Sequence, residues 1–241
     1  EATREGVNES VRIFLASKVD QYVSNENVEG VINALGAGVP SRFTPINAQT
    51  SDQSITIGVK QIYQGAWNPV AGLTDTYSTQ IWFTLFDPSL TGHPFSGKIF
   101  PIRTDWEIET NGPQSVVNVP TDAIIWDSKS KNWKEVGPNT FAISKATFDL
   151  NFGEWHNGQK MNMNDIIYST YFLLEWGSEK DENDKTFDSD YSPQAAQTAK
   201  TLVGIKPIDN DTIEVYTNYW HFDEGEIASW TSPWSSMPWE I

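Results

Sequence analysis

The stretch from Thr140 to Phe152 constrains the fold of this chain more than any other. Apolar side chains alternate there with polar ones, and Ala146, Phe148, Leu150 and Phe152 fall on one face. A period of two residues is typical of a β-strand that buries one face and turns the other to solvent. The chain must therefore build a sheet that is covered on at least one side.

Other segments predict further strands around this one. Their apolar and β-branched residues occur in short runs that are bounded by turn residues. We expect strands at residues 10–15, 54–60, 100–108, 123–126, 133–136, 205–208 and 212–217. The strands at 123–126 and 133–136 predict a meander. The strands at 205–208 and 212–217 predict a hairpin.

The clearest helix begins near Asn162, because Asn162 and Asp165 have the spacing of a capping box, and it is expected to stop at Gly177. Further helices are predicted over 76–86 and 192–203, with a weak one over 19–35.

These elements follow one another without a regular βαβ rhythm, which favours an α+β fold with a mixed, mostly antiparallel sheet and a few helices. A composition change near residue 65 divides the sequence into an amino-terminal extension of uncertain domain membership, 1–65, and a domain over 66–241.

Composition excludes several classes of protein. A formal net charge of −16 and a pI near 4.4 argue against a nucleic-acid partner, because phosphate binding needs a basic surface. The absence of cysteine excludes disulfides and cysteine–zinc sites. No apolar run reaches the ~18–20 residues of a membrane span, and no signal peptide precedes the first strand. We therefore expect a mature or trimmed, monomeric chain.

No pattern in the sequence points to catalysis. The three histidines lack metal-ligand spacing, and no HExxH, GxSxG, P-loop or GxGxxG motif occurs. With 32 acidic residues, carboxylate pairs of the glycosidase type are unavoidable and uninformative. The acidic stretch 181–190 lacks the glycine and final glutamate of an EF-hand. The prediction is a chain with no catalytic residue, no metal and no cofactor.

Eleven tryptophans provide the main functional signal, because aromatic faces stack on sugars and peptides. Trp82, Trp106, Trp126 and Trp133 lie in patterned segments and are assigned to packing. Aromatic residues in turn-rich or aperiodic segments are candidates for the lining of a ligand cleft. These candidates are Trp67, Tyr77, Trp155, Trp230 and Trp234. Packing across the sheet is the alternative for each of them.

The segment from Lys145 to Gly177 resembles a signature of the peptide/nickel family, family 5, of extracellular solute-binding proteins. Its parts are the strand Thr147-Phe-Asp-Leu150, the turn Trp155-His-Asn-Gly158 and the helix start Asp165-Ile-Ile-Tyr-Ser169. Two flanking stretches, 68–107 and 203–215, agree in order and spacing. The chain departs from the family where Pro101 to Trp106 lacks a Leu-Ala-Ser core. The chain looks most like archaeal members.

This resemblance implies a periplasmic-binding-protein-type fold, of which residues 66–241 correspond to the amino-terminal lobe with its small β-rich domain. It implies capture of peptides or oligosaccharides outside the cell, in a protein anchored at the membrane, for an ABC permease. The carboxy-terminal lobe would then be missing from this chain. No ligand-binding residue carries over from the family. A surface-layer or adhesion module is the alternative function, and a carbohydrate-active hydrolase is the third.

Overall fold

The computed structural model describes residues 2–9, 19–59, 67–68, 72–73, 75–189 and 192–241. Its central feature is a six-stranded sheet with the order β5-β10-β12-β11-β7-β8. The strands are β5 (Thr104–Glu109), β7 (Ile124–Asp127), β8 (Asn132–Glu135), β10 (Ser144–Leu150), β11 (Leu202–Pro207) and β12 (Thr212–Thr217). All neighbouring strands in this sheet pair antiparallel. The predicted α+β class with a mostly antiparallel sheet is thereby confirmed, as are the meander and the hairpin.

Strand β10 lies inside the sheet, and its alternation explains the core. Phe148 faces Trp106 of β5 on one side and Ile213 of β12 on the other. Ala146, Phe148 and Leu150 are fully or almost fully buried, whereas Asp149 is exposed on the opposite face. The main hydrophobic core therefore covers one face of the sheet.

A smaller core lies against the opposite face. Val117, Val119, Ala123 and Ala142 pack there with Tyr216, whose neighbour Val215 belongs to the main core. Two short strands, β6 (Val117–Asn118) and β9 (Phe141–Ala142), pair beside it. The opposite face is thus covered only locally.

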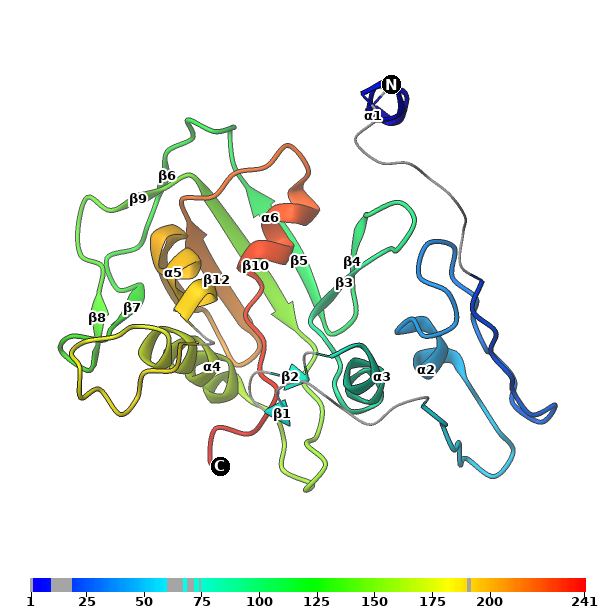
Figure 1. Cartoon of the computed structure of the whole chain (residues 1–241). Helices are drawn as coiled ribbons and strands as arrows, with labels where there is room; N and C mark the ends of the chain where they lie inside the picture. The colour runs from blue at the N-terminus through cyan, green and yellow to red at the C-terminus, as the bar shows by residue number, and fades with distance from the viewer. Residues whose placement is uncertain (1, 10–18, 60–66, 69–71, 74, 190–191) are drawn as a thin grey trace.

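Helices cover the main-core face of the sheet (Figure 1). They are α4 (Met163–Trp176), α5 (Ser192–Thr201) and α6 (Glu224–Thr231). Helix α4 packs on α5 and β7, and α6 packs on β4, β5 and β10. The predicted capping box is present at α4: Asn162 accepts from the backbone of Asn164, and Asp165 accepts from the backbone of Asn162.

Asp165 also joins three separate parts of the chain. Its buried carboxylate accepts hydrogen bonds from the indole of Trp155 at 3.4 Å and from the backbone N–H of Trp239 at 2.9 Å. Together with the one from Asn162, these donors give the buried side chain three hydrogen bonds among the described residues. The turn before α4 and the end of the chain are both fixed to the start of this helix.

The remaining elements are short. They are α1 (Ala2–Asn8), α2 (Phe43–Asn47), β1 (Trp67–Asn68), β2 (Gly72–Leu73), α3 (Thr76–Leu85), β3 (Leu90–Gly92) and β4 (Ile99–Pro101). Strands β1 and β2 form one antiparallel pair, and β3 and β4 form another. The predicted helix 76–86 is confirmed as α3, and the side chain of Asp75 caps it.

Contacts connect the amino-terminal segment to the rest of the molecule. The guanidinium of Arg42 donates to the carbonyl of Phe86 at 2.6 Å and lies 4.4 Å from the ring centroid of Phe83. Phe43 stacks on Phe100 of β4, with ring centroids 5.9 Å apart. Residues on both sides of the predicted boundary at 65 therefore pack against each other.

Two predictions for the amino-terminal segment are wrong, and a third lies outside the described residues. Residues 54–59 form no strand, and no strand in the described part of the chain pairs with them; Ile55 and Ile57 stay exposed. Residues 19–35 form turns and a bridge between Glu29 and Gln49, not a helix. Gly30 has a φ of 75°, which interrupts helical geometry. The predicted strand 10–15 falls on residues that are not described.

No helix was predicted after Tyr219, but this part of the chain contains α6. Asp223 caps this helix by accepting from the backbone N–H of Gly225 at 2.9 Å. Among the described residues, none of the helices combines the length and the hydropathy needed to span a lipid bilayer.

Candidate functional site

A cleft of about 410 Å³ opens on the main-core face of the sheet. One wall comes from α4 and α5, and the other comes from α6 and the following residues 232–237. Ile205 of β11 and Val215 of β12 contribute to its floor. This volume lies within the range of about 300–1,000 Å³ that is usual for small-molecule sites.

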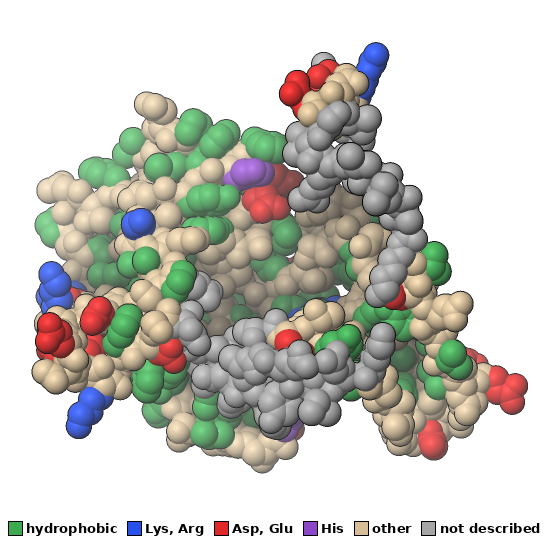
Figure 2. Space-filling view, in the orientation of Figure 1, with side chains coloured by type: hydrophobic (Ala, Val, Ile, Leu, Met, Phe, Trp, Pro, Cys, Tyr) green, Lys and Arg blue, Asp and Glu red, His purple; other side chains and the backbone are tan. Residues whose placement is uncertain are grey.

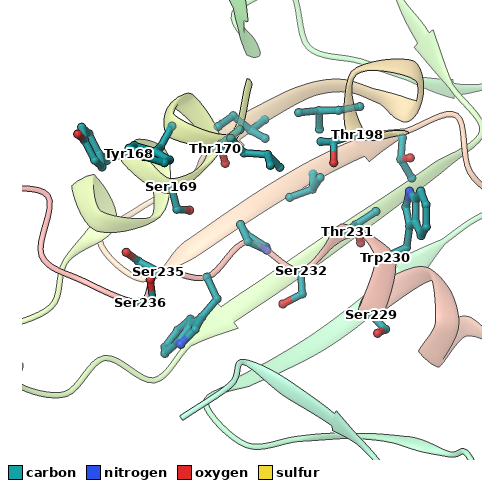
Figure 3. A pocket seen from close by; sticks show the side chains of 18 of the residues that line it. Tyr168, Ser169, Thr170, Thr198, Ser229, Trp230, Thr231, Ser232, Ser235 and Ser236 are labelled. Carbon is teal, nitrogen blue, oxygen red and sulfur yellow. The ribbon is translucent and has the colours of Figure 1, made fainter. Parts of the chain in front are cut away.

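Hydroxyl groups dominate the polar lining of this cleft. They come from both walls, as Figure 3 shows, with strands of the sheet running between. The residues are Ser169, Thr170, Thr198, Thr201, Thr217, Ser229, Thr231, Ser232, Ser235 and Ser236. Hydroxyls both donate and accept hydrogen bonds, so this lining can pair with polar groups of either kind on a ligand.

Most of these hydroxyls are oriented by the protein itself. Ser169 and Thr170 donate to the carbonyl of Ile166, and Thr231 donates to that of Ile227. A hydroxyl that donates to the backbone keeps lone pairs free to accept. In the described part of the chain, Thr198 and Ser229 have no hydrogen bond from their hydroxyls, so both donor and acceptor capacity remain there.

Aromatic rings supply the apolar lining. They belong to Trp82, Phe86, Tyr168, Phe172, Trp230 and Trp234. Trp82 stacks on Phe86 with centroids 5.0 Å apart, and Trp230 stacks on Tyr219 with centroids 4.9 Å apart. The rings are therefore held by their neighbours and present fixed surfaces to the cleft.

No aspartate, glutamate, lysine, arginine or histidine is among the described residues that line the cleft. This is unusual for a chain with 32 acidic and 16 basic residues. In the space-filling view the hollow between the helices is mainly tan and green, and most red and blue side chains lie toward the edges of the molecule (Figure 2). The cleft is thus suited to an uncharged ligand, because a buried charge without a partner is costly.

Two of the five predicted ligand-binding residues line this cleft, namely Trp230 and Trp234. Trp155 and Tyr77 are not among the described residues that line it. Trp155 lies at the turn before α4, where its indole contacts Asp165, and Tyr77 lies in the first turn of α3. Trp67 is in β1, and its side chain is outside the described part of the structure. Trp82 was assigned to packing alone, but it also lines the cleft.

The hydroxyls of the cleft were missed in the sequence. Ser169 and Thr170 come from α4, Thr198 and Thr201 from α5, and the serines at 235 and 236 from the tail. Only Thr198 and Thr201 carry a local signal, because residues three apart lie on one helix face. The other hydroxyls come from segments that lie far apart in the sequence, and only the folded structure brings them to the same cleft.

A buried ionic cluster holds the acidic loop beside α4. Glu175, whose side chain is 3% exposed, accepts from Lys180 at 2.5 Å, from the indole of Trp126 at 2.9 Å and from Thr186 at 3.1 Å. Lys180 also pairs with Asp184 at 3.2 Å. The acidic loop is therefore fixed to the helix by its own charges.

The cluster lowers the pKa of the carboxyl groups of Glu175 and Asp184. Burial by itself raises the pKa of Asp184, but hydrogen bonds from Thr186 and Lys180 outweigh it and bring the pKa to about 2. For Glu175 burial acts in the same direction, and the bonds from Lys180, Trp126 and Thr186 keep its pKa below the ordinary value. Both groups are therefore charged near neutral pH. In the described part of the chain, no three acidic or histidine side chains are grouped as metal ligands would be.

Comparisons of the sequence with protein-family models and with curated proteins find no match.

Proposed function

We propose that this chain is the solute-capturing part of an extracellular binding protein of the family 5 type, which delivers its ligand to an ABC permease. The observation that carries the proposal is the neutral cleft, with hydroxyls and fixed aromatic rings on its two walls. Such a lining binds a solute by stacking and hydrogen bonding. The solutes that fit are peptide main chains and oligosaccharides.

The signature segment supports this proposal by its place in the molecule. Strand β10, the turn at 151–161 and the capped helix α4 form one continuous unit, in the order that the family resemblance implies. Helix α4 then provides Tyr168, Ser169 and Thr170 to the cleft. The segment that carries the resemblance thus also supplies a wall of the candidate site.

The mechanism proposed is binding followed by closure of a second lobe over the ligand, in a periplasmic-binding-protein-type fold. No bond of the solute is broken. Hinge closure of this kind uses the contacts of the ligand with both lobes to favour the closed state. The residues of the cleft would provide the contacts of one lobe, in a protein held outside the cell at the membrane.

A melting experiment on the chain tests the proposal. The melting temperature is measured with maltotriose, tri-alanine or a nickel–histidine chelate added at increasing concentration. Binding to the folded state stabilises it by about 2.7 kcal/mol when the ligand is at 100 times its Kd. We expect a concentration-dependent rise with at least one of the first two probes. A cooperative transition that no probe moves would overturn the proposal and favour an interaction module.

A further inference from the structure

We infer that the ligand of the cleft is a neutral oligosaccharide, whose sugar rings stack on Trp230 and Trp234. This inference rests on the proposed function and narrows it to one class of solute. Three features of the described residues carry it: the state of the two indoles, the supply of free hydroxyls, and the absence of charge from the lining.

Trp230 presents one ring face and no hydrogen-bond donor. Its indole N–H donates to the hydroxyl of Thr201 at 3.0 Å, and Tyr219 covers one face at an interplanar angle of 20°. The residue still exposes 42% of its surface. What remains for a ligand is therefore a rigid apolar plane, which matches the C–H face of a pyranose ring.

Trp234 is fixed in the same way from a different part of the chain. Its indole N–H donates to the backbone carbonyl of Asp87 at 2.8 Å, so its polar group is also satisfied. The ring lines the cleft together with that of Trp230. Because both indoles are held by protein hydrogen bonds, stacking on them costs little conformational entropy.

Hydroxyls between and beside the rings match the edge of a sugar. Ser229, next to Trp230, and Thr198, on the facing helix, have no hydrogen bond from their hydroxyls within the described residues. Figure 3 shows both side chains at the same end of the cleft as Trp230. Sugar hydroxyls donate and accept, and so do these side chains. A ring stacked on Trp230 therefore has polar partners at its edge.

The neutral lining disfavours a free peptide. A short peptide brings an ammonium group and a carboxylate, and both lose water when it enters the cleft. No charged side chain among the described lining residues pairs with either group. The unpaired charges would then oppose binding, whereas an uncharged trisaccharide has no such cost.

Calorimetry with five probes tests this choice. Maltotriose, cellotriose and tri-N-acetylchitotriose are titrated into the chain, alongside tri-alanine and its blocked form, N-acetyl-tri-alanine amide. We expect at least one trisaccharide to bind tenfold or more tightly than either peptide. Tighter binding of either peptide would overturn the oligosaccharide assignment and leave solute capture standing. Binding of no probe would overturn the proposed function itself.

Two matched tryptophan variants locate the binding. Trp230→Ala removes the stacking plane, and Trp239→Ala removes a tryptophan that is equally exposed, at 40%, but does not line the cleft. We expect Trp230→Ala to weaken the best trisaccharide about tenfold and Trp239→Ala to leave its affinity unchanged.

Trp230→Phe keeps an aromatic face and serves as a second variant, which keeps the test valid if Trp230→Ala does not fold. It is expected to retain most of the affinity. Equal affinities for Trp230→Ala and Trp239→Ala, with both variants melting cooperatively, would overturn the stacking role of Trp230.

Discussion

At the scale of single residues, Asp184 provides a measurable link between charge and stability. Its pKa in the folded chain is about 2, below the ordinary value of 3.8. A carboxyl with a lowered folded pKa stabilises the native state above its unfolded pKa, and this stabilisation is lost as the pH falls through the folded value. The ionic cluster on α4 should therefore weaken only in strong acid.

We expect Asp184→Asn to be less stable than the native chain by a constant amount from pH 7 to about pH 5. The gap should then close as the pH falls toward 2, because the native carboxyl becomes protonated as well. Urea unfolding at a series of pH values measures this gap. Glu182→Gln removes one charge from the same exposed loop and serves as the control. A gap that widens in acid would contradict the assignment.

Residues were predictable where their role depends on their neighbours in sequence. Asn162 and Asp165 were identified as a capping box because both partners lie within one turn. Trp230 and Trp234 were placed in the candidate site from an aromatic-rich tail. The contact of Trp155 could not be predicted in this way, because its indole donates to Asp165, ten positions further on and across a turn.

At the scale of elements, β10 is the strand on which the main core depends most. It pairs with β5 on one side and β12 on the other, and its apolar face forms the centre of the main core. Loss of packing on this face should therefore affect the whole molecule, whereas a change on its other face should not.

Phe148→Ala should lower the free energy of unfolding by about 3–5 kcal/mol, because the ring is fully buried and its removal leaves a cavity. Thr147→Ala, one position away on the opposite face, should cost about 1 kcal/mol or less. Urea denaturation of both variants measures the difference. Equal losses would mean that the strand does not bury the face assigned to it.

Elements were predictable when they were long and periodic, as the strand at 140–152 and the helix from 162 were. The strand predicted at 54–60 is wrong over the described residues 54–59, because alternation in the sequence does not by itself supply a partner strand. Helix α6 was missed because the four tryptophans after Tyr219, one of which lies inside the helix, suggested an irregular tail. Asp223 and Glu226, at N-cap and third-position spacing, are the local signal that was available.

At the scale of the whole molecule, Arg42 links the amino-terminal segment to α3. Burial lowers the pKa of its guanidinium, and the charge of Asp87 partly offsets this. The side chain contributes a hydrogen bond to Phe86 and a contact with the ring of Phe83. These contacts bear on whether residues 1–65 fold together with the rest of the chain.

Arg42→Ala should destabilise the complete chain by about 1–3 kcal/mol, because a carbonyl loses its donor and a cation–π contact is removed. Lys98→Ala removes an exposed cation from the nearby β3–β4 hairpin and should have an effect within about 0.5 kcal/mol. The midpoint of urea unfolding measures both. Identical midpoints would show that the contacts of Arg42 contribute nothing to the stability of the chain.

The strand order also determines the sequence of events when the chain folds. Strands β5 and β10 pair across a short stretch of chain, but β10 reaches its other neighbour, β12, only after residues 151–211 have been synthesised. Such non-local pairing is slow, because the ends of a long loop must meet first. During synthesis, the edge of β10 that faces β12 therefore lacks its partner until residue 217 has been made, and unpaired backbone groups on a strand edge favour aggregation.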